Sequence, residues 1–521
     1  MHGLLPSLLL AQQLALHQAA GAVVIGGLTS SSSSAPASAA GGGATLGWTQ
    51  SYTAGYKDLN GQWCGGSEIM HIKPHKGKLF AFNGYWEDPR YTPASTPYNS
   101  SSAQVLRLDS ANGSWVVDLD TGAGGVAHMK GNIMHSVVFR TDSTGKLLPQ
   151  PMTLLVAASF AGQGQPSATP AISVWVRDDT GAPGVWTQTT LLAGSSGGRR
   201  VPRDIEVHRD SVTGVDRIFL LCGDSGVISG VLSTTTMGTG TGAAPAPPFI
   251  EWDTAPEFPI GSPNKTFPVR ALGMTASNGQ LFFSVGGQLY RRIDGVNPSW
   301  SLAWQIPGKV NTEVGGIRGL STVPTPATSR STSNGGEESL LFVWTPNGNS
   351  EGLIFRLDGP SLANRTEATL RQLYDSHAKQ AAGGAKLGTS KSSLGGYNKI
   401  FPVTDPASGQ LLHLVGFEQS LIGADPSLLW NQYYGGACYA VRRPQTTARH
   451  DVEVEYAYDT HEVNDLYSHG KPVLEAPRAF AMSPFAGEEH VLYVGGFDAN
   501  FHPSENMAWI FKAGLRTVLH A

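Results

Sequence analysis

Hydrophobic and polar positions along the chain follow a repeating pattern. Each copy begins with a polar residue, continues into a β-like run and passes through a turn rich in Asp, Gly and Pro. It then enters a second, more apolar run that often ends in Gly. Short apolar runs bounded by turn residues are typical of β-strands, so the pattern predicts a protein of strand repeats. Seven copies begin at Glu68, His135, Arg203, Arg270, Arg318, Asn398 and Arg478.

A third and usually a fourth β-like run follow each pair, as in ISVWVRD then VWTQTTLL, LIFRLDG then ATLRQLY, and CYAVRRP then VEVEYAY. Four strands per repeat describe one blade of a β-propeller. We therefore predict an all-β fold, a seven-bladed β-propeller. Six blades with a misread insertion, or a pair of β-sandwiches, are the alternatives. The Trp-Asp signature of WD40 blades and the sialidase boxes are absent, so the pattern predicts an architecture and no family.

The two ends of the repeat array complement each other. The last repeat has three β-like runs and then the chain stops, whereas GWTQSYTAG near the N-terminus has no partner of its own. We predict that Trp48 to Tyr52 pairs as the outermost strand beside Ala508 to Lys512, so that the N-terminal strand closes the ring in the last blade. Closure removes the exposed sheet edges at which proteins aggregate.

The region before the repeats has a different composition. Residues 1–29 are mostly apolar and predict a signal peptide or apolar leader. Residues 30–43 are almost purely Ser, Ala and Gly, typical of a linker, and the propeller is predicted over 44–521. We expect a secreted, extracellular glycoprotein, with an unprocessed tail as the alternative. Four N-x-S/T sequons, in segments that we interpret as loops, fit this expectation: Asn99, Asn112, Asn264 and Asn364.

Composition excludes several classes of protein. Charged residues make up 15% of the chain and the net charge is −4, unlike a basic protein that binds nucleic acid through phosphates. With 64 glycines and 33 prolines in 521 residues, the chain is too rich in turn formers for a helical bundle. It has no apolar run of about 18 residues, so we expect no membrane span. We expect a monomer.

The three cysteines are too few for a disulfide framework and lack zinc spacing. Cys222 ends an apolar run, where a free thiol is usually buried. Cys64 and Cys438 fall on loops that we place on one face of the propeller. They are therefore the one candidate pair for a bridge.

The first residue of each repeat is expected to face the mouth of the central channel. All seven positions are polar, and four carry arginine. Guanidinium groups suit carboxylate, sulfate and phosphate, so the pattern predicts an anion site to which Asn398 also contributes. In the competing interpretation nearby carboxylates neutralise these arginines. The candidate ligand residues are Arg203, Arg270, Arg318 and Arg478, and the candidate neutralising residues are Asp204, Glu313 and Glu475.

Two long segments add candidate ligand residues on the same face. One insertion carries Trp86 and Glu87, and the segment GFDANFHPSEN carries Asp498 and His502. Aromatic side chains beside acidic and amide groups are typical of carbohydrate clefts, because sugar rings offer apolar faces and hydroxyl edges. The bland alternative is that each aromatic anchors its own loop.

These features favour a secreted propeller that binds a uronate- or sulfate-bearing glycan. A polysaccharide lyase would use His135 or a loop tyrosine as base, and a glycoside hydrolase would use Glu68 with Glu87 or Asp498. The alternative is a non-catalytic platform for a protein or matrix partner. No cofactor motif is present; calcium is the candidate ion, through oxygen ligands at Asp498 and Asn500. The arginines disfavour a dication on the channel axis. Whether the protein is an enzyme stays open.

Overall fold

The structure is a computed structural model of the chain. All of its described strands lie in one compact unit, Thr45–Ala521. The predicted leader and linker lie outside the described residues. The structure describes residues 47–85, 102–123, 126, 128–161, 171–179, 184–191, 201–233, 249–261, 270–307, 316–326, 337–346, 352–382, 389–422, 433–434, 437–445, 456–463, 476–497 and 508–520.

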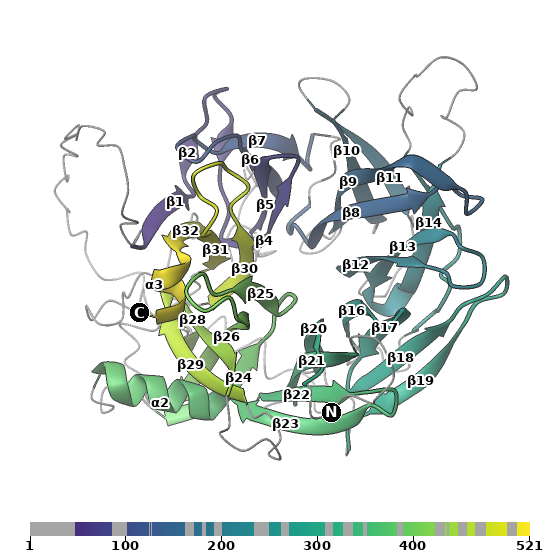
Figure 1. Cartoon of the computed structure of the whole chain (residues 1–521). Coiled ribbons are helices and arrows are strands. Elements are labelled where there is room, and N and C mark those ends of the chain that lie inside the picture. Colours follow the sequence, from purple (N-terminus) through teal and green to yellow (C-terminus); the bar gives the residue numbers. More distant parts are fainter. Residues whose placement is uncertain are drawn as a thin grey trace, which may run out of the picture. The chain divides into compact units, whose positions relative to one another are not determined.

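Four separate sheets have four strands each, joined antiparallel in chain order (Figure 1). In each sheet the first two strands form the hairpin that the repeat pattern predicts. Their strands are β8 (Ile133–Thr141), β9 (Leu147–Ala161), β10 (Ala171–Asp178) and β11 (Val185–Leu191); β12 (Pro202–Arg209), β13 (Asp216–Cys222), β14 (Gly226–Leu232) and β15 (Ile250–Trp252); β16 (Ala271–Ser277), β17 (Gln280–Val285), β18 (Gln288–Ile293) and β19 (Ser299–Gln305); and β20 (Gly316–Pro324), β21 (Glu338–Thr345), β22 (Leu353–Asp358) and β23 (Ala363–Thr369).

An eight-stranded sheet joins the two ends of the chain. Its halves meet at a single residue pair, Phe497 with Glu68. β1 pairs antiparallel with β32, so the predicted closure by the N-terminal strand is confirmed. One half holds β4 (Glu68–His75), β5 (Lys78–Gly84), β6 (Gln104–Leu108) and β7 (Val116–Asp120); the other holds β30 (Ala476–Met482), β31 (Val491–Phe497), β32 (Trp509–Gly514) and β1 (Thr49–Thr53); beside them β2 (Tyr56–Lys57) pairs with β3 (Trp63–Cys64).

The sheet between β20–β23 and β30 has a divided first strand. β24 and β25 both pair with β26, and the residues between them, 396–400, leave the ladder. Gly396 has φ 61°, a left-handed conformation that favours glycine. The strands are β24 (Thr389–Gly395), β25 (Phe401–Thr404), β26 (Leu411–Ile422), β27 (Tyr433–Tyr434), β28 (Cys438–Pro444) and β29 (Tyr456–Glu462).

Two helices occur among the described residues, α2 (Leu370–Ala382) and α3 (Leu515–His520). The prediction of one continuous strand at ATLRQLY is wrong, because β23 ends at Thr369 and α2 begins at the next residue. Leu370 and Tyr374 are buried. Tertiary burial of this helical face therefore overrides the β-like appearance of the segment.

The sheets follow one another through their first strands. β4, β8, β12, β16 and β20 each contact the next, and β21 contacts β24. β26 contacts β30, which in turn contacts β4, so the series closes on itself. The all-β propeller architecture is confirmed, and the count of seven blades stays a prediction.

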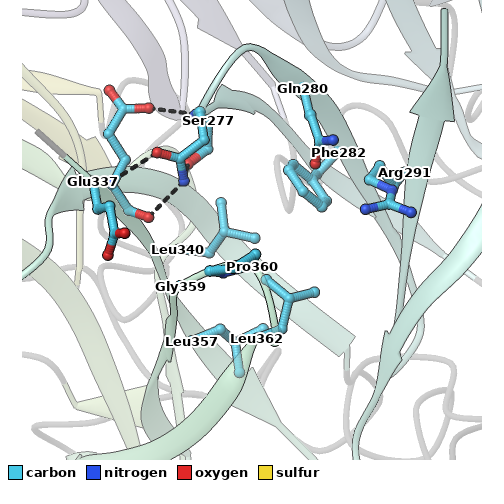
Figure 2. A pocket seen from close by; sticks show the side chains of 12 residues that line it. Ser277, Gln280, Phe282, Arg291, Glu337, Leu340, Leu357, Gly359, Pro360 and Leu362 are labelled. Carbon is cyan, nitrogen blue, oxygen red and sulfur yellow. Dashed lines mark hydrogen bonds between the residues drawn. The ribbon is translucent and has the colours of Figure 1, made fainter. Parts of the chain in front are cut away.

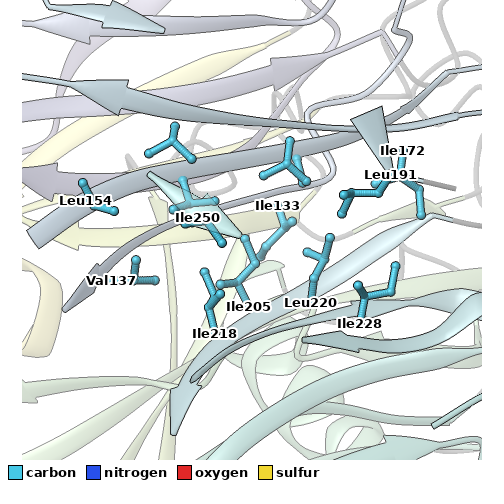
Figure 3. Close-up of a cluster of buried hydrophobic side chains, with 14 of the residues drawn as sticks. Ile133, Val137, Leu154, Ile172, Leu191, Ile205, Ile218, Leu220, Ile228 and Ile250 are labelled. Atoms are coloured by element: carbon cyan, nitrogen blue, oxygen red, sulfur yellow. The ribbon is translucent and has the colours of Figure 1, made fainter. Parts of the chain in front are cut away.

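Neighbouring sheets are held together by apolar layers. Between the β8–β11 and β12–β15 sheets, Ile133, Ile205, Ile218 and Leu220 are each at most 4% exposed (Figure 3). Burying such a side chain contributes about 1.5–3 kcal/mol. These layers fix the first strands, whose starting residues form the candidate site.

Five of the first strands carry one extra residue near the start. The register shifts once in each of β4, β12, β16, β20 and β30. The two paired residues that flank the shift are at most three positions apart in every case. A β-bulge of this kind bends the strand and re-aims the side chains beside it. The bulge residue is Arg203 in β12 and Arg478 in β30, whereas Arg270 and Arg318 precede the bulges in their strands. The four arginines are therefore close to, but not at, one equivalent position.

Candidate functional site

A buried carboxylate lies among cations at the start of β4. The Glu68 side chain is fully buried. Its Oε2 lies 3.0 Å from Nη1 of Arg478, and its Oε1 lies 3.4 Å from Nζ of Lys130. The pair of Glu68 and Arg478 spans the junction between the first and last sheets, because β4 and β30 are neighbours.

The four predicted arginines interact electrostatically. The pKa of Arg203 is lowered to about 9, first by burial and then by the charges of Arg270, Arg318 and Arg478, while Glu68 opposes the shift. Burial also lowers the pKa of Arg318 to about 10, again with Arg270 and Arg478 contributing. Like charges shift one another's pKa in this way only at short range. The four side chains therefore act on one another's charge, and their convergence on the channel axis stays a prediction.

Tyr397 lies within this arginine cluster. Its ring centroid is 4.4 Å from Cζ of Arg478 and 5.7 Å from Cζ of Arg318. The ring of Phe497 lies 4.1 Å from the same Arg478 carbon. Burial raises the pKa of the Tyr397 hydroxyl, and the charge of Glu418 adds to the shift. Aromatic faces stabilise guanidinium groups held out of water, so Arg478 is stabilised by Glu68 and by two rings.

Asn398 occupies the break between β24 and β25. Its Nδ2 donates to the carbonyl of Met70, 2.6 Å away, and to the carbonyl of Arg478. It thus fastens the divided strand to both β4 and β30. Gly319 in β20 has φ 62°, and a Cβ there would lie 2.9 Å from the carbonyl oxygen of Asn398. The predicted ligand residue Asn398 therefore has a clear structural task.

The position of His135 at the channel mouth stays a prediction. β8 begins two residues earlier, at Ile133, and has no bulge at its start, so the repeat register is displaced in this sheet. His135 lines a hollow that Arg203, Tyr397 and Asn398 also line. Burial lowers its pKa well below the usual value, and the charges of Lys73 and Lys399 lower it further. Lys130, which the sequence pattern did not single out, pairs with Glu68.

The expected neutralisation of Arg203 by Asp204 is not what the structure shows. Oδ2 of Asp204 accepts the amide of Met274 at 2.8 Å, and Oδ1 accepts the amide of Ile205. Burial raises the pKa of Asp204 to about 6, against the opposing charge of Lys399. Asp204 is therefore used to join β12 to β16, and Lys399 pairs with Glu206 at 2.5 Å.

Several predicted candidates are not placed. Trp86, Glu87, Asp498 and His502 lie outside the described residues. So do Glu313 and Glu475, which were expected to neutralise arginines. The calcium ligands expected at Asp498 and Asn500 also lie outside the described residues. Their roles stay predictions.

All three cysteines are buried free thiols, so the prediction for Cys222 is confirmed and the candidate bridge is absent. Cys64 lies in β3 and Cys438 begins β28, so neither is on a loop. Asn112 lies in an exposed turn, as expected of a sequon. Asn364 is exposed but lies in β23 and not in a loop.

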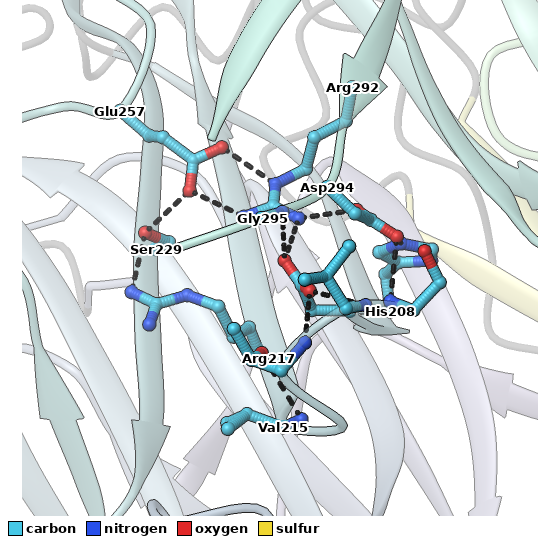
Figure 4. Close-up of polar contacts among 12 residues, drawn as sticks. His208, Val215, Arg217, Ser229, Glu257, Arg292, Asp294 and Gly295 are labelled. Atoms are coloured by element: carbon cyan, nitrogen blue, oxygen red, sulfur yellow. Dashed lines mark hydrogen bonds and ion pairs between the residues drawn. The ribbon is translucent and has the colours of Figure 1, made fainter. Parts of the chain in front are cut away.

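Outside the mouth, arginines are held in matched ion pairs. Nε of Arg292 lies 2.8 Å from Oε1 of Glu257, and its Nη1 lies 2.8 Å from Oδ2 of Asp210 (Figure 4). Asp294 bonds the same guanidinium and also His208. Despite burial, these partners raise the pKa of Arg292.

The same arrangement recurs in other third strands. The spacing R-x-D marks it, and in each case the aspartate contacts the arginine two residues earlier. The sequence analysis missed this signal. The pairs are Arg107–Asp109, Arg177–Asp179, Arg292–Asp294 and Arg356–Asp358.

A second hollow lies between the β16–β17 turn and the β22–β23 turn (Figure 2). Phe282, Leu340 and Leu357 form its apolar floor, with Arg291 and Glu337 at its rim. It is at the end of β16 away from Arg270, and therefore separate from the arginine cluster.

In the part of the chain that the structure describes, no helix has the length and apolar character needed to span a bilayer. No group of three or more His, Cys, Asp or Glu side chains there is placed to hold a metal ion.

No protein-family model matches the chain, and no curated protein matches it. Among solved structures it is similar to an ancestral GH74 enzyme, at 11% identity and TM-score 0.48 over 89% of this chain and 51% of that one. This chain thus spans about half of that enzyme.

A copper-bound fungal alcohol oxidase of the AA5 family is similar over 90% of this chain and 76% of its own, at 10% identity and TM-score 0.44. An α-L-arabinofuranosidase from Fusarium graminearum is similar over 86% and 93%, at 8% identity and TM-score 0.39. A GH43 glycoside hydrolase is also among the structural neighbours. These likenesses assign the chain to no family, and its propeller fold follows from its own strand order.

Proposed function

We propose that the channel mouth binds a carboxylate or sulfate group of an anionic saccharide. The observation that carries the proposal is the charge balance among the described residues of the mouth. Two carboxylates, Glu68 and Glu418, act on these side chains, alongside four arginines, which are Arg203, Arg270, Arg318 and Arg478. An anion would relieve the repulsion among the cations.

The contrast with the outer arginines supports this proposal. Arg292 and Arg442 have raised pKa values because carboxylates surround them. Arg203 and Arg318 have lowered pKa values because burial and like charges dominate. Arg292 and Arg442 therefore suit a structural role, whereas Arg203 and Arg318 gain most from an added anion.

Binding is the proposed function, and catalysis is not needed for it. A lyase that used His135 as base gains little support, because burial and nearby lysines make its imidazole a weak base. The non-catalytic platform would present the same face without the charge preference. We extend the proposal to a secreted location, for which the apolar leader and the exposed sequon Asn112 are the support.

The test is binding to matched neutral, uronic and sulfated oligosaccharides by titration calorimetry. Replacing Arg318 with Gln should weaken binding of the anionic members by about 2–5 kcal/mol, the scale for losing one partner of a desolvated charge pair. Added salt should weaken binding as well.

Arg292→Gln is the matched control, because it removes a buried arginine that has its own carboxylates. It should lower the melting temperature and leave glycan affinity unchanged. Equal affinity for neutral and anionic oligosaccharides, or an Arg318→Gln variant that loses stability and no affinity, would contradict the proposal.

A further inference from the structure

Lys130 combines features of a reactive amine. Its side chain is 9% exposed, and its Nζ lies 3.4 Å from Oε1 of Glu68. Arg478, which holds the other oxygen of that carboxylate, and Arg203 are its charged neighbours. Arg478 already pairs with Glu68, so neutralising that carboxylate does not by itself require Lys130.

The backbone around Lys130 is fixed on two sides. Lys130 forms a bridge with Gly84 of β5, and its carbonyl accepts a hydrogen bond from the hydroxyl of Ser159. Gly131 donates its amide to the carbonyl of Asn83 at 2.9 Å. A side chain mounted on such a backbone keeps its direction, as a reacting group requires.

The electrostatic surroundings favour a neutral amine. Burial lowers the pKa of Lys130 to about 7, and the charges of Arg478 and Arg203 act in the same direction while Glu68 opposes them. Lys399 in the same channel behaves in the opposite way, since Asp204 and Glu206 raise its pKa. A lysine must be neutral to attack a carbonyl carbon, and a lowered pKa is the usual device for this.

We propose that Lys130 forms an imine with a carbonyl compound that also carries a carboxylate, such as the open-chain aldehyde of a uronic acid. The inference rests on the proposed function, because the mouth arginines are to hold the carboxylate. The amine nitrogen adds to the carbonyl carbon, and Glu68 carries one proton from the nitrogen to the former carbonyl oxygen, which gives the carbinolamine. Glu68 then carries the second proton from the nitrogen to that hydroxyl, which leaves as water while the carbon–nitrogen double bond forms. One amine and one carbonyl thus give one imine and one water, with no change of oxidation state.

The experiment is reductive trapping on the full chain. The protein is incubated at neutral pH with sodium cyanoborohydride and one of three sugars, and peptide mass spectrometry locates the modified lysines. D-glucuronate has both the aldehyde and the carboxylate. D-glucose lacks the carboxylate, and methyl β-glucuronide has no free aldehyde.

We expect glucuronate to label Lys130, and glucose to label it at least about tenfold less, which corresponds to one lost contact. Lys399 should show no such preference. Glu68→Gln should slow labelling of Lys130, because the proton carrier is gone. Lys130→Met should abolish the preferential label, with Lys399→Met as the matched control that keeps it.

The two proposals fail separately. If methyl β-glucuronide binds but glucuronate leaves Lys130 unlabelled, the imine is wrong and the anion site stands. Equal labelling of Lys130 by glucose and glucuronate also overturns the imine inference. If none of the anionic sugars binds, the proposed function fails and this inference with it. The outcome on the parent protein decides these cases even where a variant does not fold.

Discussion

The same residue type serves two purposes in this molecule, and its surroundings decide which. Arg292 lies against Glu257, Asp210 and Asp294, whose charges hold its positive form in place. Arg318 lies against the ring of Tyr397. Burial and the charges of Arg270 and Arg478 lower its pKa, while the charges of Tyr397 and Glu418 oppose the shift. In buried sites the partner's charge outweighs the intrinsic preference of the side chain.

Buried histidines give a prediction about pH. Burial lowers the pKa of His71 to about 3, because its charged form is poorly solvated. In the unfolded chain the pKa returns to about 6.5. Below pH 6.5 the unfolded state therefore binds a proton that the folded state does not. Stability should fall as pH falls toward 3, by up to about 1.4 kcal/mol per pH unit for each such group.

His71→Gln tests this effect, because the Gln amide can still donate to the carbonyl of Asn132 that His71 contacts. Urea unfolding at several pH values between 6 and 4 should show a shallower decline for the variant than for the parent. The exposed His490 is the control, and His490→Gln should keep the parent's slope. A His71→Gln variant with the parent's slope would assign the acid sensitivity to other groups.

Sequence reasoning reached some of the site at this scale. It placed the four arginines near the starts of first strands, where the structure has them, and their convergence on one axis stays a prediction. It could not predict that Glu68 pairs with Arg478, because the two residues lie at opposite ends of the chain and meet only on closure. Lys130 gave no signal, since it precedes its strand. Tyr397 follows two glycines that mark the divided strand, and that signal was available.

At the scale of elements, bulges set where the mouth side chains point. In β20 the register shifts between Arg318 and Ser321, and Gly319 lies inside the shift. Its left-handed φ of 62° places the backbone against Asn398. Both the turn and the close approach depend on glycine.

Gly319→Ala should therefore destabilise the protein twice over, by about 1–2 kcal/mol of backbone strain and by a clash with the Asn398 carbonyl. Gly279→Ala is the matched control. It has φ 73° but nothing within 4 Å of the new Cβ, so it should show the strain alone. Denaturant titrations measure the loss of unfolding free energy in each variant. Equal losses for Gly319→Ala and Gly279→Ala would mean that the contact with the Asn398 carbonyl relaxes easily.

The third strands give a second prediction at this scale. Arg292→Met would leave Asp210, Glu257 and Asp294 without their shared cation, and breaking a buried pair in this way costs about 3–5 kcal/mol. Arg292→Lys should lose less, because it keeps the charge and gives up the planar fork. Thermal unfolding of the two variants should rank them in that order. If Arg292→Met leaves the melting temperature unchanged, the three carboxylates take up protons in the variant.

The regular strands were predictable because each has a short apolar run and a turn signal. α2 was not, because its segment combines β-like and helical residues and only burial of Leu370 and Tyr374 decides between them. The divided first strand was not predictable either, since a break depends on contacts with β4 and β30 that the sequence does not display.

At the scale of the whole molecule, closure joins the two ends of the chain. Tyr52 of β1 is 2% exposed and pairs with Ile510 of β32. Its hydroxyl donates to the carbonyl of Gly65 at 2.7 Å, and its ring meets Trp115 edge-on at 6.3 Å. A strand that is short in sequence thus has both a hydrogen-bonded ladder and a buried anchor.

The last prediction concerns this anchor. Tyr52→Ala should cost about 3–5 kcal/mol, the usual loss for a large buried aromatic. It should also loosen β1 and expose the edge of β32, so the variant should aggregate on warming.

Tyr52→Phe keeps the ring and should cost about 1 kcal/mol, because Asn83 also donates to the Gly65 carbonyl. Thr49→Ala, in the same strand but exposed, should change stability by less than about 0.5 kcal/mol. Urea titration measures the three losses, light scattering measures aggregation, and hydrogen exchange at the β32 amides reports whether β1 still covers them. If Tyr52→Ala behaves like Thr49→Ala in all three, the propeller is stable without its closing strand, and the match between the two chain ends has another purpose.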